Sequence, residues 1–176
     1  MIKALWFRWL MVIGIIMAIL IGYLSWLVHG VNRRATNAAI ATDLRLAAAM
    51  LIEDAFERDV DLPVGLHWYE PAMLRYNQPS YLGLDGSDDT ESDFIRTNVS
   101  SVGLGERKPI LFVRPDVFGG TRTQAVFWRR AGSAGLLHTQ LHVYWIEEDM
   151  FEVVRNGLPV EVSTLEVART RSGVDP

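Results

Sequence analysis

The hydropathy pattern is dominated by an apolar run at residues 9–28, which contains no charged side chain. At about 1.5 Å of rise per residue, a helix of this length spans about 30 Å, the thickness of the hydrocarbon core of a bilayer. The run predicts a transmembrane helix at 9–28, a short N-terminal tail at 1–8 and an extramembrane domain at 29–176. A cleaved signal peptide is the alternative, although its apolar core is usually only about 7–15 residues long.

Aromatic residues cluster at both ends of the apolar run. Trp6 and Trp9 stand near its start, and Tyr23 and Trp26 stand near its end. Because amphipathic rings prefer the headgroup region, we expect these four side chains to mark the two membrane interfaces.

Gly14, Ala18 and Gly22 are spaced four residues apart within the run and share one helix face. Small residues at this spacing let a second helix backbone approach closely. We therefore expect this face to pack against another integral membrane protein. Chance is the alternative, because glycine and alanine are common in membrane helices.

Basic residues flank the apolar run on both sides, with Lys3 and Arg8 before it and Arg33 and Arg34 after it. The positive-inside rule therefore gives almost no orientation. We expect a single-pass protein of the cell membrane with its large domain in the periplasm, because short N-terminal anchors commonly have that topology.

A helical pattern follows the apolar run after a break at Gly30. Apolar residues recur at spacings of three and four over residues 35–59, namely Ile40, Leu44, Ala47, Leu51 and Ala55. This periodicity predicts an amphipathic helix at 35–59 that ends before Pro63.

Residues 64–108 have no clear periodicity, which is unusual over such a length in a compact domain. Within this irregular segment lies an acidic run at residues 85–93 (DGSDDTESD). Carboxylates are ligands that Ca²⁺ prefers, but the run lacks the EF-hand spacing, so a solvated loop is the favoured interpretation.

The pattern becomes strand-like at residues 109–168, where short apolar or alternating runs occupy 109–114, 123–129, 137–147, 151–155 and 160–167. Asn156 and Gly157 between the last two runs predict a hairpin. We expect an antiparallel meander of about four strands. The fold class is therefore α+β, with the helix at 35–59 covering one face of the sheet.

Two histidines, His138 and His142, are four residues apart on the longest predicted strand. On a strand this spacing separates them by about 13 Å, too far to share one metal ion. No nucleophile elbow, phosphate loop or zinc-protease motif occurs in the sequence. We therefore predict no catalytic residue, no metal site and no cofactor, and expect that the protein is not an enzyme.

Alternation along the strand at 137–147 divides its side chains between two faces. Leu137, Leu141, Val143 and Trp145 lie on one face, and His138, Gln140, His142 and Tyr144 lie on the other. The second set is polar and aromatic, a composition favoured at protein interfaces, and we name it the candidate partner surface. An ordinary half-solvated sheet face is the alternative.

Composition and charge narrow the possible partners. Residues 1–34 hold 4 basic and no acidic residues, which leaves 13 basic and 21 acidic residues, a formal charge of −8, for residues 35–176. An acidic domain binds phosphate backbones poorly, so we expect no nucleic-acid partner. The chain has no cysteine, which excludes disulfides and thiolate metal sites.

The order of elements resembles that of type IV minor pilins and secretion pseudopilins. Residues 50–59 (MLIEDAFERD) resemble the end of the long helix in the larger members, and Asn156 and Gly157 stand where these often have a hairpin. The resemblance implies an apolar helix continued as an amphipathic one and followed by an antiparallel sheet. The family's early glutamate has no counterpart here, because the first acidic residue is Asp43.

Three functions follow as expectations. The leading one is a membrane-anchored accessory or structural subunit that braces a larger respiratory, photosynthetic or secretory complex, with integral membrane proteins and the lipid bilayer as its partners. The second is a minor pilin or pseudopilin of a secretion or pilus machine. The third is a membrane-tethered metal-binding or enzymatic domain that uses His138, His142 and the acidic run.

Overall fold

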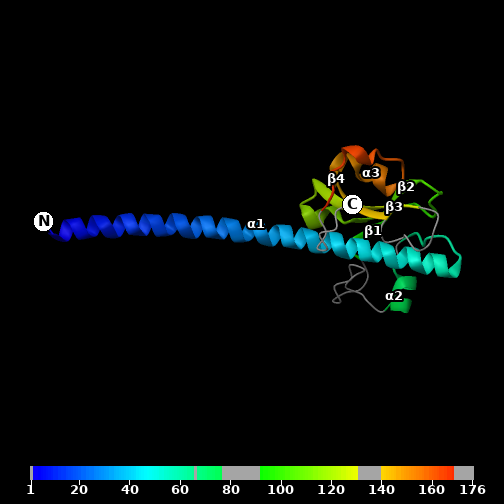
Figure 1. Cartoon of the computed structure of the whole chain (residues 1–176), viewed down its shortest axis with the longest axis horizontal. Helices are drawn as coiled ribbons and strands as arrows, with labels where there is room; N and C mark the ends of the chain where they lie inside the picture. Colours follow the sequence, from blue (N-terminus) through cyan, green and yellow to red (C-terminus); the bar gives the residue numbers. More distant parts are fainter. Residues whose placement is uncertain (1, 66, 77–91, 131–139, 169–176) are drawn as a thin grey trace. The chain divides into compact units, whose positions relative to one another are not determined.

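The computed structural model describes residues 2–65, 67–76, 92–130 and 140–168 (Figure 1). The chain forms two compact units, Met1–Asn37 and Ala38–Pro176. The second unit contains a sheet with helical segments on both of its faces, so the coarse prediction of an α+β fold with an apolar N-terminal helix is confirmed.

Helix α1 (Ile2–Arg58) is a single element of 57 residues. The predicted break at Gly30 is wrong, because the helix continues through this residue. A glycine inside a helix costs only about 1 kcal/mol relative to alanine, and α1 contains no proline that would remove a hydrogen bond. The helix predicted at 35–59 is therefore part of a longer element and not a separate one.

The first unit consists of the N-terminal part of α1. Its side chains from Met11 to Val31 are exposed, and the apolar ones among them include Ile19 at 67% and Trp26 at 72%. Among the described residues, α1 is the one helix that is long and apolar enough to cross a membrane. This confirms the candidate transmembrane helix by length and composition.

The sheet of the second unit has four antiparallel strands in the order β1-β2-β3-β4. They are β1 (Phe94–Arg96), β2 (Arg107–Val113), β3 (Arg122–Arg129) and β4 (Leu141–Glu147). The register between β2 and β3 shifts between Pro109 and Leu111, where proline has no N–H to donate to the ladder. A four-stranded antiparallel sheet is confirmed, but β1 lies before residue 109, where no strand was predicted.

The first hydrophobic core lies between the C-terminal part of α1 and one face of the sheet. Leu44, Leu51 and Ile52 of the helix belong to the same buried cluster as Val126 and Val143 of the sheet. Five buried alanines allow close packing against this part of the helix backbone, namely Ala41, Ala47, Ala48, Ala49 and Ala55.

The division of α1 into an apolar and a polar face is incomplete in this part of the helix. Asp54 is only 3% exposed, whereas Leu46 is 36% and Phe56 38% exposed. The predicted stripe therefore describes the core-facing positions but not a fully amphipathic helix.

The second core covers the opposite face of the sheet, which the sequence did not predict to be covered. Phe112, Phe127 and Ile146 pack there with Val154 of helix α3 (Phe151–Arg155). Two 3₁₀ turns complete the cover, η4 (Glu148–Met150) and η5 (Val162–Thr164). Both faces of the sheet are therefore buried.

The predicted hairpin at Asn156 and Gly157 is wrong, because residues 151–155 form α3 instead of a strand. The amide of Gly157 donates to the carbonyl of Val154 at 3.0 Å, and that of Leu158 donates to the carbonyl of Val153 at 3.0 Å. These two bonds are a Schellman cap, in which glycine takes the left-handed conformation, here with φ of 67°. Asparagine–glycine thus ends a helix here.

Residues 64–108 contain regular elements that their irregular pattern did not predict. They include helix α2 (Glu70–Tyr76), strand β1 and the first residues of β2. The helix has 7 residues and β1 has only 3. Elements this short are fixed by tertiary packing and leave little periodicity to read.

The outer edge of β4 is partly covered by the chain that returns along it. The amide of Trp145 donates to the carbonyl of Glu166 at 2.8 Å, and that of Ala168 donates to Val143 at 2.8 Å. Of the strand predicted at 160–167, only this final stretch pairs with the sheet, through the Tyr144–Val167 bridge.

Candidate binding pocket

A pocket of about 360 Å³ lies within the second unit, where α1 ends. Three segments and one strand end contribute to it: the end of α1, the chain that follows it, the loop before β2 and the end of β3. The lining residues are Ala55, Phe56, Asp59, Val60, Asp61, Leu62, Ser100, Ser101, Val102, Trp128 and Arg130. We call this site the α1-end pocket.

The end of α1 is fixed by a Schellman cap with Asp59 in the position that usually holds glycine. The amide of Asp59 donates to the carbonyl of Phe56 at 3.3 Å, and that of Val60 donates to Ala55 at 3.0 Å. Asp59 has a φ of 52° and is the one described non-glycine residue with a positive φ. Aspartate tolerates this conformation better than most residues, and the cap places Asp59 among the residues that line the pocket.

The second side of the pocket is held in place by a buried guanidinium. Arg96 is 6% exposed and donates to the carbonyl oxygens of Pro63 at 2.9 Å and Ile110 at 2.7 Å, and also to that of Val99. The amide of Leu62 donates to the carbonyl of Ser100 at 2.9 Å. These bonds tie the chain after α1 to the loop at 97–102.

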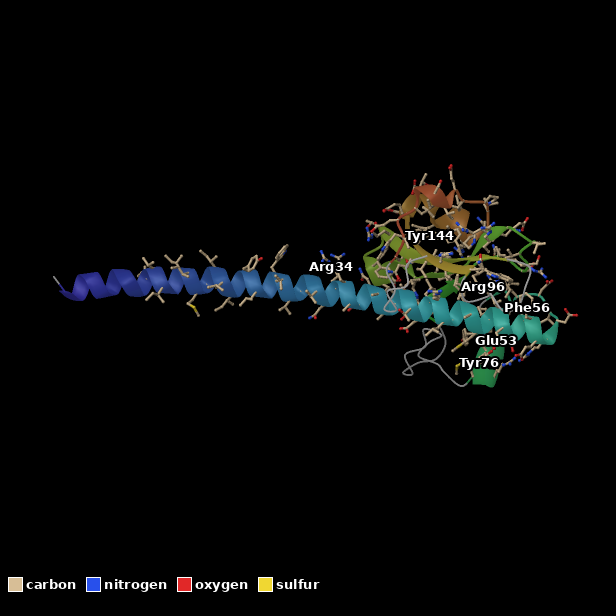
Figure 2. The ribbon with its side chains drawn as sticks, in the orientation of Figure 1. Arg34, Glu53, Phe56, Tyr76, Arg96 and Tyr144 are labelled. Carbon is tan, nitrogen blue, oxygen red and sulfur yellow. The ribbon has the colours of Figure 1, made fainter. Side chains whose placement is uncertain are left out.

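Burial lowers the pKa of Arg96 to about 10, so this side chain stays charged at neutral pH. Carbonyl oxygens replace the water that the cation loses on burial. Figure 2 labels Arg96 between the sheet and α1. Arg96 therefore acts as a positioning residue for the walls of the pocket.

The aromatic wall of the pocket comes from Phe56 and Trp128, whose rings meet edge to face with centroids 6.0 Å apart. Trp128 is 4% exposed, and its indole Nε1 is buried with no hydrogen-bond partner among the residues that the structure describes. A buried donor without an acceptor costs about 1–3 kcal/mol. The indole N–H is thus closed off inside the wall and is not a donor that the pocket presents.

Charged groups surround the mouth of the pocket. The guanidinium of Arg130 lies 5.6 Å from the centroid of the Phe56 ring and donates to the carbonyl of Val102 at 3.4 Å. Asp59 and Asp61 are exposed, and neither forms an ion pair with any described residue. The mouth therefore carries two unpaired carboxylates beside one guanidinium that already has partners.

A separate charged cluster docks α2 against α1. Asp54 Oδ1 lies 3.0 Å from Arg58 Nε and 3.8 Å from Arg75 Nη1, and Arg75 also pairs with Glu57. Helix α2 lies on the side of α1 away from the sheet (Figure 1). The bridging role of Arg75 is structural.

Tyr76 belongs to the same region of the second unit. Burial raises the pKa of the Tyr76 hydroxyl, and the negative charge of Glu53 raises it further. Figure 2 labels both residues beside α2. The tyrosine therefore stays neutral at physiological pH.

The predicted packing face of the membrane helix is open in this structure. Gly14, Ala18 and Gly22 lie on α1 and are exposed, and a Cβ at either glycine would meet no atom within 4 Å. The groove is thus available to a second helix, and its partner stays a prediction.

Of the four predicted interface aromatics, two have described side chains. Tyr23 is 58% and Trp26 72% exposed, and their ring centroids lie 6.2 Å apart. Trp6 and Trp9 lie on α1 where side chains fall outside the described part of the chain.

The residues of the candidate partner surface differ in their exposure in the folded domain. Tyr144 is 7% exposed in the second core, where its ring packs on Phe127 with centroids 5.4 Å apart. Gln140 and His142 are half-buried, and His138 lies outside the described residues. Burial lowers the pKa of His142, and the positive charges of Arg107 and Arg45 lower it further. The Tyr144 side chain is thus a core residue, because α3 and the segments beside it cover this face.

The described residues contain no cluster of side chains that could bind a metal ion. Among the described residues, no three side chains of histidine, aspartate or glutamate come together. Of the acidic run at 85–93, only Ser92 and Asp93 belong to that part of the chain. The Ca²⁺ hypothesis stays a prediction.

The sequence did not reveal the α1-end pocket. Its residues come from positions 55–62, 100–102 and 128–130, which no local pattern connects. Two features of the sequence could have indicated the pocket. Asp59 and Asp61 stand directly after the helix and before Pro63, and Trp128 is followed by two arginines at the end of a strand.

Comparisons with known proteins leave the family open. No protein-family model matches the chain, and neither a curated protein nor a solved structure matches it.

Proposed function

We propose that the protein is a single-pass membrane-anchored accessory subunit whose extramembrane domain binds and braces other proteins of a membrane complex. The observation that carries the proposal is the helix at residues 11–28, which is apolar and exposed along its whole length. A surface of this kind needs lipid or protein around it. The domain that follows offers a pocket for recognition.

The packing face supports the idea of a protein neighbour in the membrane. Gly14, Ala18 and Gly22 provide a groove where a second backbone can approach. Co-purification in a mild detergent tests the proposal. We expect a defined complex in which other integral membrane proteins accompany the chain, and a monomer alone would contradict it.

We further propose that the large domain lies outside the cytoplasm. The chain contains no cysteine, so a single introduced thiol is the only labelling site. Ser163→Cys places the thiol in the exposed turn η5, and Lys3→Cys places it at the N-terminal end of α1, before the apolar run. A membrane-impermeant maleimide should label Ser163→Cys in intact spheroplasts and Lys3→Cys only after permeabilisation. The reverse pattern would overturn this topology.

A minor-pilin-like component is the second candidate, and one observation favours it. Helix α1 is continuous from Ile2 to Arg58, and its C-terminal part packs on a four-stranded antiparallel sheet. That arrangement is what the resemblance to minor pilins implies. Such proteins are processed by a dedicated peptidase, so mass spectrometry distinguishes the candidates: a truncated N-terminus supports the pilin-like function, and an intact Met1 rejects it.

A further inference from the structure

An aromatic pair and an open position share one face of α1 near the end of the apolar run. The rings of Tyr23 and Trp26 are exposed at 58% and 72%, and their centroids lie 6.2 Å apart. Gly30 follows Trp26 by four residues and Tyr23 by seven, so it lies on the same helix face. A Cβ at Gly30 would meet no atom within 4 Å. This face therefore has open space directly after its aromatic rings.

Two arginines complete the same face. Arg33 and Arg34 stand three and four residues after Gly30, so helix geometry places them on either side of the stripe that runs through this glycine. Both residues are exposed, and neither forms an ion pair with any residue that the structure describes. The first acidic residue of the chain is Asp43. Figure 2 labels Arg34 on α1. This face thus carries two guanidinium groups without a counter-ion.

The distance along the helix places both arginines among lipid headgroups. With a rise of about 1.5 Å per residue, Arg33 and Arg34 lie about 8 and 9 Å beyond Val28, the end of the apolar run. The headgroup layer on each side of the hydrocarbon core is about 5–8 Å thick, and an arginine side chain can reach back into it. Guanidinium groups bind phosphate through paired, charge-assisted hydrogen bonds. The arginines are therefore within reach of lipid phosphates.

We propose that this face of α1, made by Tyr23, Trp26, Gly30, Arg33 and Arg34, binds an anionic phospholipid in the leaflet next to the extramembrane domain. The phosphate pairs with the two guanidinium groups, the glycerol backbone lies over Gly30, and the start of the acyl chains packs on the aromatic rings. An anionic lipid is favoured because its headgroup has no amine to neutralise the phosphate. This inference rests on the proposed function, because it requires α1 to be the membrane anchor. We call this surface the lipid face.

The lipid face is separate from the predicted packing face. At 3.6 residues per turn, the stripe of Gly14, Ala18 and Gly22 points roughly a third of a turn away from it. A lipid bound at the arginines therefore leaves the groove open to a second membrane helix.

The test measures lipid binding to the full chain in nonionic detergent by native mass spectrometry. The probes are phosphatidylglycerol, which is anionic, and phosphatidylcholine, which is zwitterionic. We expect the first bound phosphatidylglycerol to bind more tightly than phosphatidylcholine. The double variant Arg33→Gln and Arg34→Gln should lose at least about fivefold in phosphatidylglycerol affinity, the contribution of a single arginine near an anionic surface. Equal affinity for the two lipids, or unchanged phosphatidylglycerol affinity in the variant, would overturn the proposal.

A matched control separates a binding face from charge alone. Exchanging neighbours, with Asn32→Arg, Arg33→Asn, Arg34→Ala and Ala35→Arg, keeps the composition, the net charge and nearly the same depth. It moves both guanidinium groups to the other side of the helix, where all four positions are exposed. We expect the exchanged chain to lose as much phosphatidylglycerol affinity as the glutamine variant. Full affinity in the exchanged chain would show that no particular face is recognised, which contradicts the proposal.

The open position at Gly30 is tested by filling it. Gly30→Leu adds a side chain where the helix has room, so α1 is kept while the space for the glycerol backbone is lost. The control Val31→Leu adds bulk on the opposite side of the helix. Phosphatidylglycerol affinity should fall in Gly30→Leu and stay unchanged in Val31→Leu. Equal affinity in the two variants would contradict the lipid face.

The lipid face and the accessory-subunit function fail in different ways. If the glutamine variant keeps its phosphatidylglycerol affinity while a complex is still recovered, the lipid face is wrong and the subunit function stands. If that variant instead loses the co-purified protein, the arginines pair with an acidic segment of a partner, and the lipid face is again wrong. If the chain is recovered only as a monomer but prefers phosphatidylglycerol, the lipid face stands and the accessory-subunit function is wrong.

Discussion

The guanidinium of Arg96 donates a hydrogen bond of 2.7 Å from Nη1 to the backbone carbonyl of Ile110, across the β1–β2 ladder. Ile110 is the residue at which the β2–β3 register shifts, between Pro109 and Leu111. The Ile110 carbonyl also accepts from the amide of Thr97 at 3.2 Å, so Arg96 adds a charged donor to a carbonyl at an irregularity in the ladder. Through its other bonds, to the carbonyls of Pro63 and Val99, Arg96 joins the sheet to the loops that form the α1-end pocket.

Replacing Arg96 should destabilise the domain strongly. Arg96→Met keeps much of the side-chain volume but removes this donor from the buried carbonyls of Val99 and Ile110 and from the half-buried carbonyl of Pro63. We expect a loss of about 3 kcal/mol or more in the free energy of unfolding. Urea unfolding in detergent, followed by tryptophan fluorescence, measures it. The exposed control Arg129→Met should stay within about 0.5 kcal/mol, and equal effects of both variants would contradict the role of Arg96.

Gly157 combines a left-handed backbone with a close neighbour at its Cβ position, and each of the other glycines that the structure describes has at most one of these two features. Its φ is 67°, and a Cβ there would collide with a methyl group of Val99. Gly119, the cap of the 3₁₀ turn η2 (Pro115–Phe118), has a φ of 85° with no atom within 4 Å of a Cβ. We expect Gly119→Ala to cost about 1 kcal/mol, because it adds only backbone strain.

Gly157→Ala should cost about 2–4 kcal/mol, since overpacking adds to the same backbone strain. Thermal unfolding of the two variants side by side measures the difference. A Gly157→Ala variant as stable as Gly119→Ala would show that the loop of Val99 moves away freely. In that case the contact between α3 and this loop does not constrain the fold.

His142 should make the domain less stable in mild acid. Burial, with Arg107 and Arg45, lowers its pKa below the ordinary value of 6.5. Below pH 6.5 the unfolded chain binds a proton that the folded domain binds only at lower pH, so acidification favours unfolding. This contribution to stability is complete above pH 6.5 and is lost as the pH falls through the lowered pKa.

The measurement compares the unfolding midpoint at pH 7.5 and pH 5.5 for the unmodified chain and for His142→Gln. The variant should lose less stability between the two pH values, because the titrating group is gone. A larger acid loss in the variant would mean that the charged form of His142 stabilises the fold. The exposed His67, replaced in the same way, is the control.

The packing face of the membrane helix gives a further prediction. Replacing Gly14, Ala18 and Gly22 together by isoleucine fills the groove without adding polarity. We expect the chain to remain in the membrane but to recover at least about tenfold less of its partner after mild solubilisation, which corresponds to about 1.4 kcal/mol of lost helix packing. Unchanged recovery would assign partner binding to another surface.

The matched control fills the opposite helix face with Val12→Phe, Ile16→Phe and Leu20→Phe. These residues are exposed at 46%, 52% and 48% in the isolated chain. Because they contact lipid in the proposed arrangement, the control should retain the partner. A stronger loss in the control than in the isoleucine variant would reverse the assignment of faces.

The long elements of this fold were predictable because each has a hydropathy pattern that extends over many residues. The apolar run that predicts the membrane helix extends over residues 9–28, and the strands β2, β3 and β4 each have 7 or 8 residues of apolar or alternating sequence. The faces of β4 were also predicted, since Val143 and Trp145 lie in the first core and Tyr144 in the second. Periodicity of this length identifies both the element and its buried side.

Short elements were mispredicted where one local signal serves two structures. Asparagine–glycine predicted a hairpin, but Asn156 has a φ of −79° and only Gly157 is left-handed, as a helix cap requires. The second core favours the helix cap over the hairpin, because it buries Val154 of α3 fully against the sheet. Tertiary packing of this kind is not encoded within the turn itself.

The candidate site was the least predictable part. The α1-end pocket joins Asp59 to Trp128 across a long stretch of sequence, and Arg96, which holds its loops, lies in a strand of three residues. Tyr144 was predicted to belong to the candidate partner surface but is buried, because the chain after β4 folds back over that face of the sheet. A sequence pattern states which face of a strand is polar but not what later covers it.

Alkaline carbonate extraction of membranes that contain the full chain determines whether α1 is a permanent lipid-embedded anchor. We expect the chain to stay in the membrane pellet, because the apolar side chains of residues 11–28 are exposed and the helix is long enough to cross the hydrocarbon core. Recovery of the intact chain in the carbonate supernatant would contradict it.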